Sequence, residues 1–112
     1  MVKKKYIPER GDIVWLDFNP QLGHEQRGRR SALTVSYKAY NEKIGLAVFC
    51  PITSKIKGYP FEVEIDSDEI KGSVLSDHVK SLDWEERNIE FIEKIADEKM
   101  DEVIEKILVI IK

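Results

Sequence analysis

Most of this 112-residue chain is a succession of short segments in which apolar and polar residues alternate, and this pattern limits what it can fold into. Residues 61–66 (FEVEID) are the clearest case, because Phe61, Val63 and Ile65 would face a core while the acidic residues between them face water. Gly, Pro, Asn and Asp separate the segments, and short strands at this spacing predict a small barrel. The predicted strands are residues 12–18, 31–37, 44–50, 61–66, 73–76, 78–82 and 88–95.

The end of the chain follows a different period. From Asp97 onward, apolar residues recur at helical spacing, with Asp97 as the expected N-cap. The stripe would pack on the barrel or on a partner subunit. The predicted fold class is therefore α+β, mainly β, with one domain spanning residues 1–112. The members of the stripe are Met100, Val103, Ile104, Ile107, Leu108 and Ile111.

Composition narrows the class of protein. Hydrophobic residues make up 42% and charged residues 35%, which is typical of globular domains. No apolar run approaches the roughly 20 residues of a membrane span, and no apolar segment of a secretory signal follows Met1. Cys50 is the only cysteine, which excludes a cysteine-rich zinc site and fits a reducing compartment. We therefore expect a cytoplasmic protein.

Charge is divided unevenly along the chain. Residues 1–61 carry eleven Lys or Arg against five Asp or Glu, whereas residues 62–112 carry seven against sixteen, within a total of -3. This asymmetry favours a basic working surface opposed to an acidic one, although the lysines could also serve only solubility.

Within the basic half, residues 23–31 (GHEQRGRRS) bring together a histidine, a glutamate, a glutamine and three arginines. Residues 19–30 connect the first two predicted strands, and a connection of this length is often functional. Cleaving RNA without a metal requires a base for the 2′-OH and a stabiliser of the phosphorane charge, and arginine suits the second task. Glu25 or His24 could supply the base. The alternative is a solvated loop in which Glu25 pairs with the arginines.

A second basic cluster follows the third predicted strand, in residues 50–60 (CPITSKIKGYP). Thr53 could donate to a phosphate oxygen, while Lys55, Lys57 and Tyr59 could follow an RNA backbone and stack on a base. A simple turn with solubilising lysines is the alternative.

Four residues outside these clusters are expected to be structural. Trp15 and Trp84 are predicted in the core or in an interface. His78 is predicted within a strand, with Asp77 bonded to it or to the backbone.

Six motifs, in order and in register from about Tyr6 to the final helix, resemble the MazF/PemK family of toxin endoribonucleases. The resemblance implies an SH3-like barrel of the MazF/CcdB toxin type, a homodimer, and metal-independent cleavage of single-stranded RNA with no cofactor. It also implies a MazE-like antitoxin whose acidic, disordered tail blocks the RNA groove. The motifs are residues 11–15 (GDIVW), 23–26 (GHEQ), 28–30 (GRR), 51–54 (PITS), 57–63 (KGYPFEV) and 77–83 (DHVKSLD).

The resemblance also assigns roles to residues. Arg30, Thr53 and Glu25 match catalytic positions of the family. One position departs from the family pattern: Ser31 stands where the family usually has proline. Serine, unlike proline, has a backbone N–H and leaves φ free. The expected RNA-contacting residues are His24, Gln26, Arg27, Arg29, Ser54, Lys55, Lys57 and Tyr59.

Three functions compete. The first is a ribonuclease toxin of a type II toxin–antitoxin system, which inhibits translation and growth. The second is a non-catalytic toxin of the same fold that poisons a protein such as gyrase. The third is a plain nucleic-acid-binding barrel. Only the first needs both Arg30 and Thr53.

Overall fold

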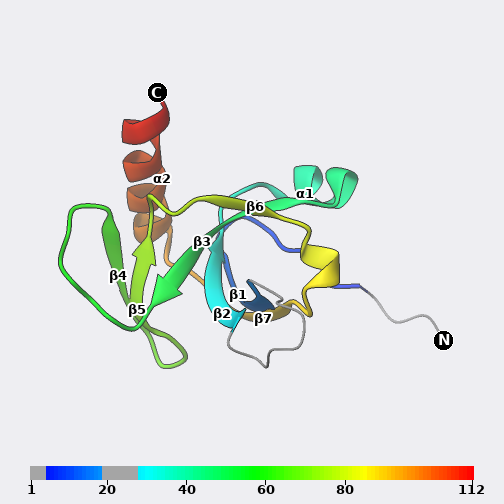
Figure 1. Ribbon diagram of the computed structural model, residues 1–112, viewed down its shortest axis with the longest axis horizontal. Helices are drawn as coiled ribbons and strands as arrows, with labels where there is room; N and C mark the ends of the chain where they lie inside the picture. The colour runs from blue at the N-terminus through cyan, green and yellow to red at the C-terminus, as the bar shows by residue number, and fades with distance from the viewer. Residues whose placement is uncertain (1–4, 19–27) are drawn as a thin grey trace.

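The fold was obtained as a computed structural model, which describes residues 5–18 and 28–112. Within these residues the sheet has seven strands; the short helix α1 and the 3-10 turn η2 lie between strands, and the long helix α2 follows the last strand (Figure 1). In chain order the elements are β1 (Asp12–Asp17), β2 (Arg29–Thr34), α1 (Lys38–Ile44), β3 (Ala47–Thr53), β4 (Glu62–Asp66), β5 (Lys71–Leu75), β6 (Lys80–Leu82), η2 (Trp84–Glu86), β7 (Glu90–Lys94) and α2 (Asp97–Ile111).

The sheet runs β4-β5-β3-β2-β1-β7, and β6 pairs with the other half of β3. Every pairing is antiparallel, and β2 and β3 lie at the centre. Because β5 and β6 pair with different halves of β3, the sheet curls into a half-barrel beside α2 (Figure 1). The predicted class, α+β and mainly β, is confirmed.

Each face of the sheet has its own core, which explains why Ile13, Val14 and Leu16 on β1 are all fully buried. One core joins α2 to the sheet and includes Ile13 and Val103. The other lies on the opposite face and contains Val14, Leu16, Phe18, Ala32, Ala47, Phe49, Leu82 and Trp84. The sheet therefore has no wholly solvated face.

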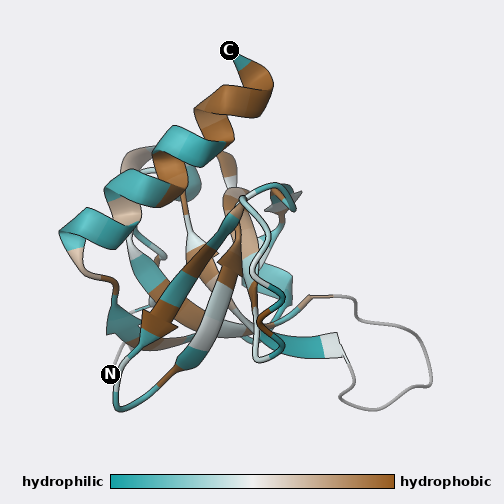
Figure 2. Ribbon diagram, turned by 90° about the vertical axis from the view of Figure 1, so that its left-hand side faces the viewer, coloured by the Kyte–Doolittle hydropathy of each residue, from teal (hydrophilic) through white to brown (hydrophobic). Residues whose placement is uncertain are grey.

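Helix α2 confirms the predicted helix, and its first turns bury Met100, Val103 and Ile107. The apolar end of the helix extends beyond the sheet (Figure 2), and Leu108 and Ile111 are exposed there. The predicted cap was wrong: Ala96 is the N-cap, without a side-chain cap bond, and Asp97 lies in the first turn. In the described part of the chain, no helix has the length and apolar character needed to cross a membrane.

Two strand boundaries differ most from the prediction, and α1 explains both. Residues 35–37 do not belong to β2, because the chain turns at Ser36 to enter α1. Gly45 ends α1 with a φ of 83°, a conformation that glycine adopts without strain. Ile44 therefore belongs to α1, and β3 begins at Ala47 and ends at Thr53.

The two tryptophans divide between core and surface. Trp84 is buried, and its indole N–H donates to the carbonyl oxygen of Asn41 at 3.1 Å, which confirms a core role. Trp15 remains 40% exposed, so it does not belong to the core of this chain.

Candidate functional site

Arg30 occupies the second position of β2, where pairing with Leu16 of β1 fixes its backbone. Strand alternation places its side chain on the same face as Ala32. Ser31, which stands where proline was expected, is buried and pairs with Trp15. The substitution therefore leaves the strand continuous on both sides of Arg30.

Thr53 is the last residue of β3. The β2–β3 ladder ends at the pair Ala32 and Pro51, two residues from Arg30 on one strand and two residues from Thr53 on the other. Arg30 and Thr53 line the same cavity at this end of the two strands. The Thr53 hydroxyl oxygen accepts a hydrogen bond from the Lys55 N–H at 3.1 Å. The two residues from separate motifs are thus brought to neighbouring strands.

Gly72 of β5 packs directly against the backbone of Thr53. A Cβ atom at residue 72 would lie 2.4 Å from the Thr53 carbonyl oxygen and 3.1 Å from its carbonyl carbon. Ordinary contacts of this kind are longer than 3 Å, so only glycine allows β5 to approach Thr53 this closely. Gly72 therefore helps to set the position of Thr53.

The charged groups of Arg30 and Lys80 both lie over the aromatic ring of Phe18. The guanidinium carbon of Arg30 lies 5.9 Å from the ring centroid, and the Lys80 ammonium lies 5.6 Å from it. Lys80 reaches this place because it pairs with Phe49 of β3. Both distances are within the range of cation–π attraction. Sequence reasoning missed Lys80, although it lies in the motif of residues 77–83.

Two cavities lie on either side of Thr53, which lines both. One has a volume of about 420 Å³ and includes Arg29, Arg30, Ser54 and Lys71 in its lining. The other has a volume of about 580 Å³ and is lined by Thr53, Lys55, Lys57, Tyr59, Glu62, Leu75, Asp77 and His78. Every expected site residue that the structure describes therefore borders one of two adjoining cavities.

The basic segment after Thr53 is held by acidic partners. The Glu62 carboxylate accepts hydrogen bonds from the N–H groups of Lys57 and Gly58, the latter at 2.7 Å. The Tyr59 hydroxyl donates to Asp77 at 2.6 Å. This bond raises the pKa of Tyr59 to about 12, so the phenol stays neutral near pH 7.

His78 differs from its expected setting. It lies in the connection between β5 and β6 rather than in a strand, and its side chain is 54% exposed. Its Nε2 lies 3.8 Å from Asp77, whose carboxylate binds Tyr59. Both residues therefore face the larger cavity, and the prediction that His78 lies within a strand was wrong.

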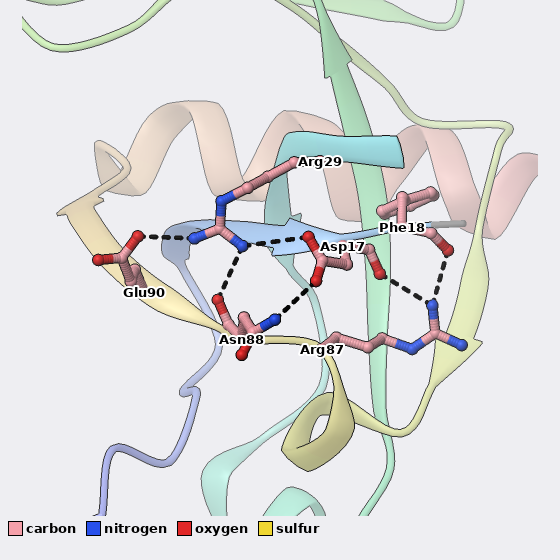
Figure 3. Close-up of polar contacts among 6 residues, drawn as sticks. All are labelled: Asp17, Phe18, Arg29, Arg87, Asn88 and Glu90. Atoms are coloured by element: carbon pink, nitrogen blue, oxygen red, sulfur yellow. Dashed lines mark hydrogen bonds and ion pairs between the residues drawn. The ribbon is translucent and has the colours of Figure 1, made fainter. Parts of the chain in front are cut away.

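Arg29 and Arg30 have different surroundings although they are adjacent, and Figure 3 shows the polar contacts of Arg29. The Arg29 guanidinium donates to Asp17 at 3.3 Å, to the Asn88 carbonyl oxygen at 2.9 Å and to Glu90 at 2.6 Å. Within residues 5–18 and 28–112, Arg30 makes no ion pair or hydrogen bond of this kind through its side chain. Arg29 is held by protein carboxylates, while Arg30 lies over an aromatic ring beside the cavity.

Four expected site residues, His24, Glu25, Gln26 and Arg27, lie outside the described residues. Among the residues that are described, no three His, Cys, Asp or Glu side chains are grouped to hold a metal ion. Burial raises the pKa of the Cys50 thiol to about 12, so this cysteine is not a nucleophile.

The fold and site define a small half-barrel protein with basic and hydroxyl side chains gathered at one end of its central strands. The chain matches the family described as the PemK-like, MazF-like toxins of type II toxin–antitoxin systems over residues 9–111. The chain therefore belongs to this family. The prediction made from its motifs is confirmed, and with it the class of protein, a toxin endoribonuclease.

Individual relatives agree with this assignment. The endoribonuclease toxin MazF of Escherichia coli (strain K12) is 40% identical over 107 residues, which cover 96% of each chain. The endoribonuclease EndoA of Bacillus subtilis (strain 168) is 31% identical over 105 residues, covering 88% of this chain and 90% of its own.

Solved structures agree as well. MazF (Form-I) from Deinococcus radiodurans superimposes with a TM-score of 0.86 at 45% identity, covering 96% of this chain and 98% of that one. The MazE–MazF complex (Form-II) from the same organism gives a TM-score of 0.85 at 40% identity, covering 96% and 97%.

Proposed function

We propose that this chain cleaves single-stranded RNA by attack of a ribose 2′-OH on the adjacent phosphate, without a metal or other cofactor. The observation that carries the proposal is that Arg30 and Thr53, at the ends of the two central strands, line the same cavity. The lysines of the larger cavity and Lys80 surround this pair with positive charge.

Each residue has a distinct part in this mechanism. The planar fork of Arg30 matches two phosphate oxygens and stabilises the charge that develops on the phosphorane. The Thr53 hydroxyl accepts one N–H and keeps its own proton to donate to a phosphate oxygen. Either Glu25 or His24 takes the 2′-OH proton, as the sequence motifs suggest, and the 2′-oxygen bonds to phosphorus. The P–O5′ bond then breaks, and the departing oxygen takes up one proton, which balances the one removed from the 2′-OH, and leaves as the 5′-OH. Lys55, Lys57 and Tyr59 hold the RNA strand on the Thr53 side.

The basic surface proposed to hold RNA is also suited to binding an acidic protein inhibitor. The relative from Deinococcus radiodurans forms a MazE–MazF complex, which supports a MazE-like antitoxin for this chain as well. A disordered acidic tail could replace RNA by presenting carboxylates to the cations that hold phosphates. We further propose that the toxin is a homodimer that acts in the cytoplasm.

Cleavage is expected to persist in EDTA and to leave a 5′-OH together with a 2′,3′-cyclic phosphate or the 3′-phosphate formed from it. The reason is that the mechanism uses side chains for charge stabilisation and the ribose oxygen as nucleophile. The measurement is incubation of a long RNA with the purified toxin, followed by mapping of the new ends. Activity that disappears on chelation and returns with Mg²⁺ would contradict the mechanism, and intact RNA would favour the non-catalytic alternative.

Lys80→Ala is expected to weaken binding of both RNA and an acidic antitoxin peptide, because the Lys80 ammonium belongs to their shared surface. For RNA, the salt dependence of log K should become shallower by about 0.7, the contribution of one phosphate contact on a single strand. The measurement is a salt titration with an RNA that carries a 2′-deoxy nucleotide at the mapped cleavage position. Lys38→Ala, which removes an exposed lysine on α1, is the control. Weaker binding of only one of the two ligands would show that RNA and the antitoxin peptide bind at different sites.

A further inference from the structure

The side chain of Arg87 binds the backbone at the end of β1 (Figure 3). Its Nη1 donates to the carbonyl oxygens of Asp17 at 2.9 Å and Phe18 at 2.7 Å, and its Nε donates to Asp83 at 2.7 Å. The Asp17 N–H returns a bond to the Arg87 carbonyl oxygen at 2.9 Å. The Arg87 side chain is only 16% exposed. Charged donors buried in this way make stronger bonds than exposed surface pairs.

Neighbouring contacts hold the same end of β1 from two other sides. The Asn88 amide donates to the Asp17 carboxylate at 2.8 Å, and Arg29 donates to the other oxygen of that carboxylate. Asn88 adopts a φ of 51°, a left-handed conformation that asparagine tolerates better than most residues. The Phe18 N–H donates to the Gly28 carbonyl oxygen at 2.7 Å.

Phe18 connects these contacts to the candidate catalytic arginine. The backbone of Phe18 is held by Arg87, and its ring lies beneath the charged groups of both Arg30 and Lys80. A shift of the Phe18 carbonyl group would move this ring and the two cations that lie over it. Geometry at a reacting centre is sensitive to such shifts, since a displacement of about 1 Å can reduce a rate about 10²-fold.

We propose that Arg87 is a positioning residue for RNA cleavage, which acts through Phe18 to hold Arg30 in its reactive place. The inference rests on the proposed role of Arg30 and adds to it a residue from the turn between η2 and β7 that touches no substrate. Arginine is required because one planar group must reach two carbonyl oxygens and Asp83 together. A lysine ammonium also has three donors, but the side chain ends one bond before the position of Nη1, so it cannot reach both carbonyl oxygens unless the backbone of Asp17 and Phe18 moves.

The test compares Arg87→Lys with Asp83→Asn, a control that retains an acceptor for Arg87 Nε and leaves both carbonyl bonds in place. On an RNA of mapped cleavage site, Arg87→Lys should lower kcat by about 10-fold to 10²-fold, while Asp83→Asn stays close to wild type. Affinity for the 2′-deoxy RNA should change less than about threefold, because the lysines of the larger cavity remain in place. Thermal unfolding of both variants reports whether they are folded.

A double-mutant cycle tests whether Arg87 acts on Arg30 through Phe18. Phe18→Leu alone should reproduce the loss of kcat, and Arg87→Lys should cost little more in that background because the ring it positions is gone. Normal kcat in folded Arg87→Lys, or fully additive losses, would overturn the positioning role. If Arg30→Ala itself retains normal kcat, the proposed function fails instead, so the two failures are distinguishable.

Discussion

Arg30→Ala is expected to reduce the rate of the cleavage step by about 10²–10³-fold, the usual cost of losing one preorganised donor to a developing negative charge. The fold should persist, because Arg30 is a partly exposed residue whose backbone pairing with Leu16 does not need its side chain. Binding of the 2′-deoxy RNA should fall much less, since the lysines of the larger cavity remain. The measurement is single-turnover cleavage with enzyme in excess over RNA.

Lys38→Ala again provides a matched control, because it removes an exposed cation of α1 that is not part of either cavity. Thr53→Ala should also slow cleavage, but less, if its hydroxyl contributes a single neutral hydrogen bond. Near-normal turnover of Arg30→Ala with saturating RNA would contradict the assignment of Arg30 as the charge-stabilising residue.

Gly72→Ala is expected to lower both activity and stability, although residue 72 touches no substrate. The added methyl group would lie 2.4 Å from the Thr53 carbonyl oxygen, and a backbone atom cannot rotate away as a side chain can. The cost in the free energy of unfolding should be about 1–3 kcal/mol, as for other overpacked sites. Displacement of Thr53 should reduce the cleavage rate by up to about 10²-fold. Chemical denaturation and single-turnover cleavage measure the two effects.

Ser73→Ala is the matched control for this variant, one position further along β5. Ser73 is buried, and its hydroxyl finds no hydrogen-bond partner among the described residues. Its removal should therefore leave stability unchanged or slightly improved. Equal activity of Gly72→Ala and Ser73→Ala would show that the close approach of β5 does not determine the position of Thr53.

Much of the fold could be predicted because its signals are local. Val63 and Ile65 alternate with acidic residues and are buried as expected, and the helical period after Asp97 gives α2. Helix α1 was missed because its stabilising contacts come from residues far away in the sequence. The side-chain amide of the buried Asn41 donates to the carbonyl oxygen of Pro8, and the Asn41 carbonyl oxygen accepts a hydrogen bond from the indole N–H of Trp84. Gly45 was the one local signal, as a helix C-cap.

The candidate site divides in the same way. Arg30 and Thr53 could be proposed because each lies in a motif, but their meeting at one cavity depends on how β2 and β3 are placed in the sheet. Lys80 and Arg87 were missed because a sequence does not show that β6 and the turn after η2 approach the end of β1. The sequence also could not show that Arg29 is held by carboxylates and Arg30 is not, because the partners of Arg29, Asp17 and Glu90, come from two other strands.

The central place of β2 and β3 has a consequence for how such a toxin is silenced. Edge strands and chain ends open often, whereas the inner strands of a sheet separate only when most of the domain unfolds. Arg30 pairs with Leu16 of β1 and Thr53 with Ser73 of β5, and both stand on inner strands of the sheet. The proposed site therefore keeps these two residues in place while an edge strand opens, and local melting of an edge provides no resting state for it. Restraint has to be imposed from outside, by a partner that occupies the surface or by removal of the toxin itself.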